Sequence, residues 1–347
     1  MGVASAAMVS NDNPLVSGSP VANAPYDVLC VGNAIVDVLA QATDDFLDQH
    51  GLVKGTMQLV DDAAAHALYA AMGPGIEVSG GSAANTAAGI ASFGGRPAFI
   101  GKVATDQLGE VFAHDLRSAG VHYGVVPAPA GSPATARCMV LVTPDAQRTL
   151  NTFLGVSAEI GPDDIDEDLV VSSAVLYVEG YLWDAPGAKA AILRAMDVAR
   201  MAGRKVAFTL SDPFCVERHR DEFIELVSAR VDILFANEVE IAALVGEGSF
   251  DAAVEAVGGM VELACLTRSE QGSVVVSGGG GTVAVPAAAV DEVLDTTGAG
   301  DLYAAGFLFG LVHGKPLAEC ARLGGIAAAE VISHLGARPL VPLTDLI

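Results

Sequence analysis

The sequence predicts an α/β protein, a three-layer sandwich with a mostly parallel central sheet to which a small β-rich lid is attached. Short apolar runs alternate with longer stretches of helical pattern along most of the 347 residues. This alternation is typical of parallel sheets that are covered by helices on both faces. Hydrophobic residues make up 52% of the chain and charged residues 17%, which is enough apolar material for a large core.

Six buried strands are expected in the central sheet. They are the runs YDVLCVG, PAFIGKV, AVLYVEG, KVAFTLS, VDILFAN and VELACLT, which begin at Tyr26, Pro97, Ala174, Lys205, Val231 and Val261. Helices are expected between them, at residues 83–93, 107–119, 186–202, 217–229 and 237–246. The uncharged run 271–290 holds four consecutive glycines and Pro286, which indicate a hairpin and not a membrane span. Such sheets bind ligands beyond the carboxyl ends of their strands.

Two segments interrupt the alternation and predict the lid. Residues 38–60 and 122–154 contain short extended runs and turns such as TPDAQ. We expect them to form one small sheet over the ligand edge; two ordinary surface hairpins are the alternative. The main nucleotide-binding domain is then expected to comprise residues 25–37, 61–121 and 155–347. Residues 1–24 are expected to be a flexible lead-in.

The composition narrows the class of partner. The formal net charge is -24, and a surface of this sign repels nucleic acids and anionic lipids. We therefore expect small-molecule ligands, with no nucleic acid and no membrane. The protein itself is expected to be either a monomer or a homodimer. The five cysteines form no C-x-x-C pair, which favours reduced thiols in a cytoplasmic protein. The sequence has no metal-ligand spacing of histidines, no G-x-S-x-G elbow and no Walker loop.

The run DTTGAGDLYAAGFL at 295–308 places an acid, Asp301, at the start of an apolar helix. The small residues Gly298, Ala299 and Gly300 precede it, so an anion can approach the free N–H groups of the first turn. An acid at this point suits a different task, to accept a proton from a hydroxyl while the N–H groups hold a phosphoryl group. An aspartate that only caps a tight turn is the alternative.

Further polar residues follow other expected strands. Asn237 and Glu240 in ANEVEIAAL are one helical turn apart, which suits a hydrated Mg²⁺, although a simple helix cap is the alternative. Thr267, Arg268 and Gly272 lie at another strand end and suit the phosphates of the donor. Candidates for acceptor binding, with a carboxylate and amides that suit hydroxyl groups, are Asn33, Asp37, Gly80, Gly81, Ser82 and Asn85. Arg148, after the turn of the lid, is a candidate clamp on the donor phosphates.

With these residues placed, the chain resembles the ribokinase-like, or PfkB, carbohydrate kinases from about Tyr26 to Gly336. DTTGAGD is similar to their C-terminal signature, the stretch from Gly80 that begins GGSAANTAAG to their N-terminal one, and NEVE to their N-x-x-E element. The resemblance implies that Asp301 is the catalytic base and that residues 298–300 form its anion hole. It also implies ATP as co-substrate, Mg²⁺ near Glu240 through water, and K⁺ near Asp295.

Within that family the chain is most similar to the adenosine kinase branch, in the runs VGNAIVDVLAQATDDFLDQHGL, LSDPF and VDILFANEVEIAAL. The base contacts that this likeness implies are Gln58, Leu154, Tyr181 and Leu182. We therefore expect transfer of the γ-phosphoryl group of ATP to the 5′-hydroxyl of a nucleoside, adenosine. A kinase of ribose, fructose or a keto-deoxy sugar acid is the first alternative, and a non-enzymatic ligand-binding protein on the same fold is the second.

Overall fold

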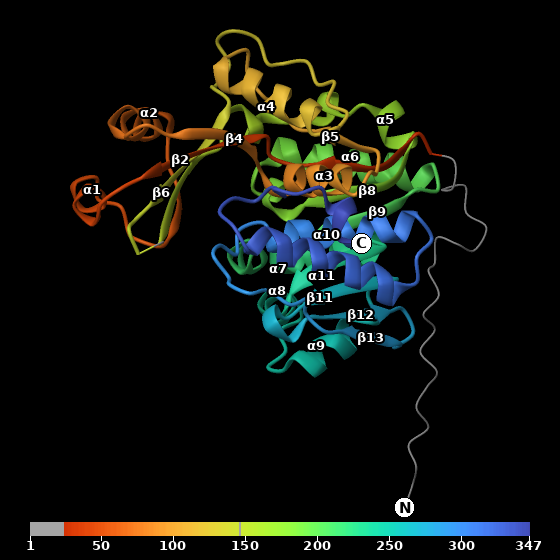
Figure 1. The fold of residues 1–347 in the computed structure, drawn as a ribbon. Coiled ribbons are helices and arrows are strands. Elements are labelled where there is room, and N and C mark those ends of the chain that lie inside the picture. Colours follow the sequence, from red (N-terminus) through yellow and green to blue (C-terminus); the bar gives the residue numbers. More distant parts are fainter. Residues whose placement is uncertain (1–23, 146) are drawn as a thin grey trace, which may run out of the picture.

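The computed structural model of the chain describes residues 24–145 and 147–347 (Figure 1). The expected lead-in, residues 1–24, lies outside these residues except for Ala24. Among the described residues, no helix has both the length and the hydropathy that a membrane crossing requires.

The main sheet has eight strands in the order β13-β12-β11-β10-β9-β8-β1-β5. The six expected strands are all present and parallel, and they are β1 (Tyr26–Val31), β5 (Pro97–Ile100), β8 (Ser173–Glu179), β9 (Lys205–Thr209), β10 (Ile233–Asn237) and β11 (Leu263–Thr267). The expected hairpin forms the antiparallel edge, as β12 (Ser273–Ser277) and β13 (Thr282–Val285).

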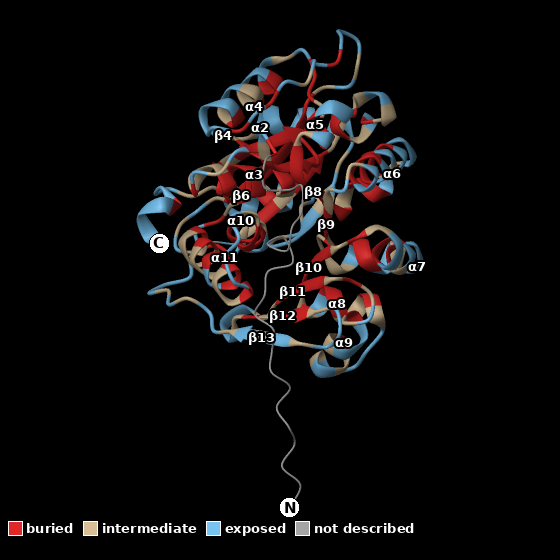
Figure 2. Cartoon of the chain, turned by 90° about the vertical axis from the view of Figure 1, so that its right-hand side faces the viewer, coloured by how far each residue is buried: buried red, intermediate tan, exposed pale blue. Residues whose placement is uncertain are grey.

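Helices cover both faces of this sheet. One face packs against α3 (Ser82–Ser92), α4 (Gln107–Ser118), α10 (Ala299–Val312) and α11 (Leu317–Ile332). The other packs against α5 (Glu167–Val171), α6 (Pro186–Met201), α7 (Pro213–Arg230), α8 (Glu238–Val245) and α9 (Phe250–Val257). Alternate residues of β1 enter the two cores, Cys30 on the α10 side and Leu29 on the α6 side. Figure 2 shows α7 with its buried side toward the strands and its exposed side outward. The predicted three-layer sandwich is therefore confirmed.

A second, five-stranded sheet projects from the main body beside α3 and α4 (Figure 1). Its strands are, in spatial order, β3 (Met57–Leu59), β7 (Arg148–Phe153), β6 (Ala136–Val142), β2 (Ile35–Gln41) and β4 (Ile76–Gly80). Helices α1 (Asp44–Gln49) and α2 (Asp62–Ala71) pack on it through a small core that includes Leu47, Leu68 and Met139. The sheet thus extends beyond the expected ranges 38–60 and 122–154, because β4 pairs with β2.

Candidate active site

Asp301 is the third residue of α10 and is held by a neighbouring helix. Its two carboxylate oxygens accept hydrogen bonds from Ser82 Oγ at 2.6 Å and from Asn85 Nδ2 at 3.0 Å, both on the first turn of α3. Thr86 Oγ1 donates to the carbonyl oxygen of Asp301 at 3.1 Å. Burial raises the pKa of Asp301, while the hydrogen bonds from Ser82 and Asn85 and the charge of Arg338 lower it. The carboxylate is thus fixed in position by donors that favour its ionised form.

The start of α10 leaves backbone donors free. Its N-cap is Gly298, whose φ of 81° lies in the left-handed region and which has no side chain to cap the helix. Within the described part of the chain, the N–H groups of Gly298, Gly300 and Asp301 donate to no protein acceptor. The N–H of Ala299, by contrast, donates to the carbonyl of Thr296 at 3.2 Å. Two of the three residues expected in the anion hole therefore have donors available.

Gly298 and Gly300 differ in the space around them. A Cβ on Gly298 would lie 2.8 Å from the Cβ of Ala337, whereas a Cβ on Gly300 would meet no atom within 4 Å. Gly298 is therefore required by the packing and the turn. Gly300 faces open space, as an approach path for an anion requires.

Asp37 on β2 lies against the Gly80–Gly81 pair that precedes α3. A Cβ on Gly80 would overlap the Asp37 carboxylate, and a Cβ on Gly81 would overlap the carbonyl oxygen of Asn33. Burial raises the pKa of Asp37 to about 7, the charges of Arg338 and Arg148 oppose this shift, and Asp301 adds to it. The structure therefore gathers the predicted acceptor-binding residues around two acids, Asp37 and Asp301.

Asn33 belongs to a buried network with Glu179, a residue that the sequence analysis did not single out. Glu179 Oε1 accepts from the backbone N–H and the Nδ2 of Asn33, at 2.8 and 2.7 Å, and its Oε2 accepts from the N–H of Ala83 at 2.8 Å. Ser157 donates to the remaining Asn33 oxygen. Burial raises the pKa of Glu179 to about 7. Both the amide nitrogen and the amide oxygen of Asn33 thus have protein partners, and the network ties the end of β1 to the start of α3.

Arg148 lies beside Asp295 rather than in an open cleft. Its Nη2 is 2.8 Å from Asp295 Oδ2, and the two side chains are 12% and 4% exposed. Asp295 also accepts from the N–H and hydroxyl of Thr297 and from the N–H of Gly336. Because a guanidinium already supplies the positive charge and the carboxylate oxygens already accept these bonds, the Asp295 side chain does not fit a directly bound K⁺ in this arrangement.

Asn237 and Glu240 form a capping box at the start of α8. Asn237 Oδ1 accepts from the N–H groups of Val239 and Glu240, while Glu240 accepts from the N–H and the Nδ2 of Asn237. No cluster of three or more His, Cys, Asp or Glu residues suited to a metal occurs among the residues described. Each Glu240 oxygen keeps one acceptor position, so the residue fits a magnesium ion that is held through water and completed by substrate phosphates.

The expected donor-binding residues at β11 lie next to this helix. Thr267 is paired in register with Asn237, and Gly272, with φ of 83°, closes the loop by accepting from the N–H of Arg268. The Arg268 guanidinium stacks on the ring of Phe250 at 4.1 Å and lies 3.7 Å from Glu238. The structure thus places these residues at the same carboxyl edge as Asn237.

The four expected base contacts are not equivalent. Leu182 is 2% exposed and packs in the core on the α6 side, so its side chain is not available to a ligand. Tyr181 is partly exposed, and its hydroxyl donates to the carbonyl of Ser211. Gln58 donates to Asn151 across β3 and β7 at 2.6 Å, and Leu154 is partly exposed at the end of β7.

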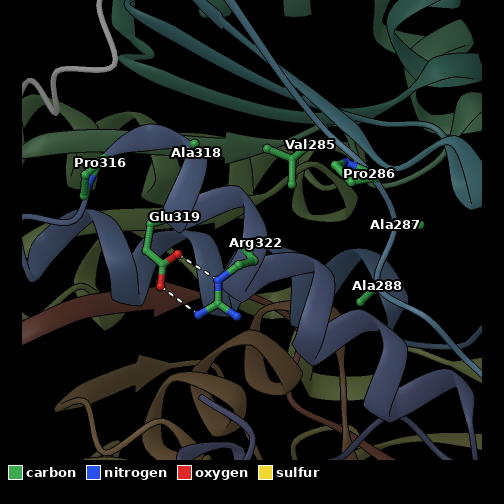
Figure 3. Close-up of a pocket in the computed structure, with 8 residues that line it drawn as sticks. All are labelled: Val285, Pro286, Ala287, Ala288, Pro316, Ala318, Glu319 and Arg322. Carbon is green, nitrogen blue, oxygen red and sulfur yellow. Dashed lines mark hydrogen bonds and ion pairs between the residues drawn. The ribbon is translucent and has the colours of Figure 1, made fainter.

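A shallow cavity of about 520 Å³ lies apart from these acids (Figure 3). The end of β13 and the residues that follow it, 285–288, form one side of it, and the start of α11 forms the other. The paired side chains of Glu319 and Arg322 line it, at 2.7 and 2.8 Å. None of its residues was predicted for the site, and the catalytic candidates do not line it.

Three comparisons identify the relatives of this chain. Residues 76–343 match the pfkB family carbohydrate kinases. The crystal structure of adenosine kinase from Sinorhizobium meliloti aligns with a TM-score of 0.86 at 53% identity, over 92% of this chain and 98% of that one. A probable sugar kinase from Rhizobium etli CFN 42 aligns with a TM-score of 0.87 at 46% identity, over 93% and 98%. The 5-dehydro-2-deoxygluconokinase of Listeria monocytogenes is 28% identical over 283 residues, 77% of this chain and 84% of that protein.

The fold and these relatives define a phosphotransferase that acts on a hydroxyl group. The chain belongs to the pfkB family of carbohydrate kinases and is a sugar or nucleoside kinase. Kinases of this family use ATP as co-substrate. The predicted family is thereby confirmed, and the non-enzymatic alternative is set aside.

Proposed function

We propose that this protein transfers the γ-phosphoryl group of ATP to the 5′-hydroxyl of a nucleoside, and that its acceptor is adenosine. The observation that carries the proposal is the geometry of Asp301, a buried carboxylate fixed by Ser82 and Asn85 beside free N–H groups at the start of α10. The 53% identity to a protein named adenosine kinase supports the choice of acceptor.

In the proposed reaction, the Asp301 carboxylate accepts the proton of the 5′-hydroxyl as its oxygen attacks the γ-phosphorus. The bond between that phosphorus and the β–γ bridging oxygen breaks, and ADP leaves with the bonding electron pair. The N–H groups of Gly298 and Gly300 stabilise the negative charge on the transferred group. Magnesium bound to ATP would neutralise phosphate charge, with Glu240 contacting it through water.

The acceptor would bind next to Asp301, between residues of the second sheet and residues of the main domain. Asp37, Gly81 and Asn85 would hold the ribose diol, and Tyr181, Leu154 and Gln58 would lie nearest the base. The second sheet would act as the lid that excludes water during transfer, so that ATP is not hydrolysed. Arg148 would reach the donor phosphates only by leaving Asp295.

The charges around the acid favour a neutral acceptor. Asp37, Glu179 and Glu240 all lie close enough to Asp301 for its charge to raise their pKa values. Placing the carboxylate of a keto-deoxy sugar acid among these groups would cost electrostatic free energy, whereas a nucleoside carries no charge. This argument favours adenosine over a sugar acid, but it does not separate adenosine from ribose or fructose.

A sugar kinase is the second candidate, supported by the likeness to 5-dehydro-2-deoxygluconokinase and to the probable sugar kinase. A coupled ADP-release assay separates the two, with adenosine, other nucleosides, ribose, fructose and a keto-deoxy sugar acid as acceptors. The proposal requires that kcat/KM for adenosine exceed that for every sugar. A sugar or sugar acid with the highest value would refute it. Asp301→Asn serves as the inactive control.

A further inference from the structure

The loop after α11 crosses the candidate active site with three consecutive residues. The N–H of Gly336 donates to Asp295 at 2.9 Å, and Ala337 fills the space beside Gly298. Arg338 Nε donates to the Oδ1 of Asn85 at 2.8 Å. Of the three, only Arg338 brings a charge to the site.

The bond from Arg338 determines which way the Asn85 amide points. The Nδ2 of Asn85 donates to Asp301 at 3.0 Å, while its Oδ1 accepts from Arg338. Rotating the amide by 180° would place its oxygen against a carboxylate and its NH₂ against a guanidinium, so both contacts would become unfavourable. Arg338 therefore selects the orientation in which Asn85 donates to Asp301.

Arg338 also places a positive charge beside the two acids of the site. It lowers the pKa of Asp301 and of Asp37, and its own pKa is lowered to about 10 by burial, against the opposing effect of Asp37, Asp115 and Asp301. The other titratable groups whose pKa values Asp301 affects are Asp37 on β2, Tyr177 and Glu179 on β8, Tyr181, and Glu240 on α8. None of these carries a positive charge, so Arg338 is the cation that lowers the pKa of Asp301, while Arg148 acts with it at Asp37.

The same side chain is poorly suited to a purely structural role. Its Nη2 is buried and has no hydrogen-bond partner in the described part of the molecule. An unsatisfied buried donor destabilises a fold, and replacing it with an apolar side chain of similar length is often neutral or stabilising. A residue kept for stability alone would be expected to satisfy this group.

We propose that Arg338 is a positioning residue for the phosphoryl transfer, which fixes the Asn85 amide toward Asp301 and supplies the positive charge beside that carboxylate. The inference rests on the proposed role of Asp301 as the base. Arg338 acts through Asn85 and Asp301 and needs no direct contact with either substrate.

The kinetic test compares Arg338→Met and Arg338→Lys with the wild-type protein at saturating ATP and adenosine. Losing a charge-assisted hydrogen bond should lower kcat of Arg338→Met roughly 10- to 100-fold, while KM for ATP changes little. Arg338→Lys keeps the charge and should lose less. The matched control is Arg194→Met, which removes an exposed arginine of α6 that pairs with Glu167 and should leave kcat unchanged.

A double-mutant cycle tests whether Arg338 acts through Asn85. If it does, Arg338→Met should lower kcat by a smaller factor when Asn85→Ala is already present, because the hydrogen bond to Asn85 is then gone and only the charge beside Asp301 is lost. An equal loss in both backgrounds would overturn the positioning role. The melting temperature of Arg338→Met should not fall below that of the wild type, and a loss of activity that follows a lower melting temperature would also overturn it.

Titration of the Asp301 carboxyl in the protein without substrates tests the role of Arg338 without depending on the proposed reaction. The ¹³C resonance of the Asp301 carboxyl, assigned with Asp301→Asn, should titrate at higher pH in Arg338→Met than in the wild type. Correspondingly, the acidic limb of kcat/KM should move to higher pH, because the base loses its charge sooner as pH falls. An unchanged titration refutes the inference. If the wild type phosphorylates no acceptor, the proposed function fails while this measurement still decides the link between the two residues. If Arg338→Met does not fold, Arg338→Gln, which also removes the positive charge, is measured in its place.

Discussion

Helices α8 and α10 carry an acid at the same position, and the charge of Asp301 reaches Glu240, yet their first turns are built differently. Glu240 and Asp301 are each the third residue of their helix. Glu240 folds back onto its own N-cap, Asn237, whose side chain accepts from the first-turn N–H groups. Asp301 instead faces α3, and its helix has a glycine N-cap with no side-chain bond.

The N-cap residue decides whether the N–H groups at a helix start are satisfied within the protein or available to a ligand. An asparagine satisfies the donors within the protein, which stabilises the helix and leaves little for a ligand. A glycine leaves donors unpaired, so the dipole and the free N–H groups attract an anion. The acid of an uncapped helix is then free to act on what binds there.

The largest expected effect is on kcat, which should fall much more when Asp301 is replaced than when Glu240 is replaced. Asp301→Asn should lower kcat by about 10²–10⁴-fold, because the amide cannot accept the proton, while ATP binding and the fold remain. Glu240→Gln should lower kcat less than tenfold, because the glutamine oxygen can still accept from the N–H of Asn237 and the residue would contact magnesium only through water. Steady-state kinetics and ATP binding by calorimetry measure both. Near-normal turnover in Asp301→Asn would remove the proposed base.

The second prediction concerns stability and pH at the capped helix. Burial raises the pKa of Glu240 from 4.5 to about 7, with a smaller contribution from the charge of Asp212 and Asp301 and an opposing one from the Asn237 N–H. The folded protein therefore binds more protons than the unfolded chain between these values, so stability is lost as pH rises through this window. Ionisation of the Glu240 carboxyl should lower the free energy of unfolding by about 3 kcal/mol between pH 4.5 and 7.

Urea unfolding of the wild type and Glu240→Gln at several pH values measures this loss. The variant lacks the titrating group, so the difference between the two free energies should grow with pH across the window. Two curves that stay parallel from pH 4.5 to 7 would show that Glu240 ionises at its ordinary value.

The third prediction contrasts the two glycines of α10. Gly298→Ala should destabilise the fold by about 1–2 kcal/mol, because φ at this residue is 81° and the new Cβ would press on Ala337. Gly300→Ala should leave stability nearly unchanged, since its Cβ enters open space, but it should raise KM for ATP or lower kcat. Thermal unfolding and kinetics of both variants test this. Equal stability of the two would contradict the assigned roles.

The sequence allowed prediction of the parts that depend on local pattern. Apolar runs located the six parallel strands, and the run from Asp295 to Asp301 located the start of α10. The second sheet was harder, because β2 pairs in parallel with β6, about a hundred residues later, and with β4, a short strand that ends in glycine. Such pairings leave no periodic signal in either segment alone.

The residues that were missed or displaced depend on contacts distant in sequence. The one sequence feature that could have indicated Glu179 is that it is a lone acid at the end of a buried strand. Its partners Asn33 and Ala83 lie about a hundred or more residues earlier. Arg338 stands in an unremarkable loop and meets Asn85 across 253 positions. Arg148 looked like a free clamp because nothing in the sequence indicates its proximity to Asp295.

The smallest expected effect tests the closed helix start itself. Asn237→Ala removes the side chain that accepts from two N–H groups and should lower the free energy of unfolding by about 1 kcal/mol. Ser249→Ala is the matched control, because Ser249 is the N-cap of α9 and accepts from a single N–H group, that of Ala252. Both variants should lose stability in urea unfolding, Asn237→Ala the more because two N–H groups lose their acceptor, but only Asn237→Ala should raise KM for MgATP, since only α8 carries the acid proposed to contact magnesium. If both variants leave that KM unchanged, the capping box has a structural role alone and the magnesium proposed at Glu240 must be held elsewhere.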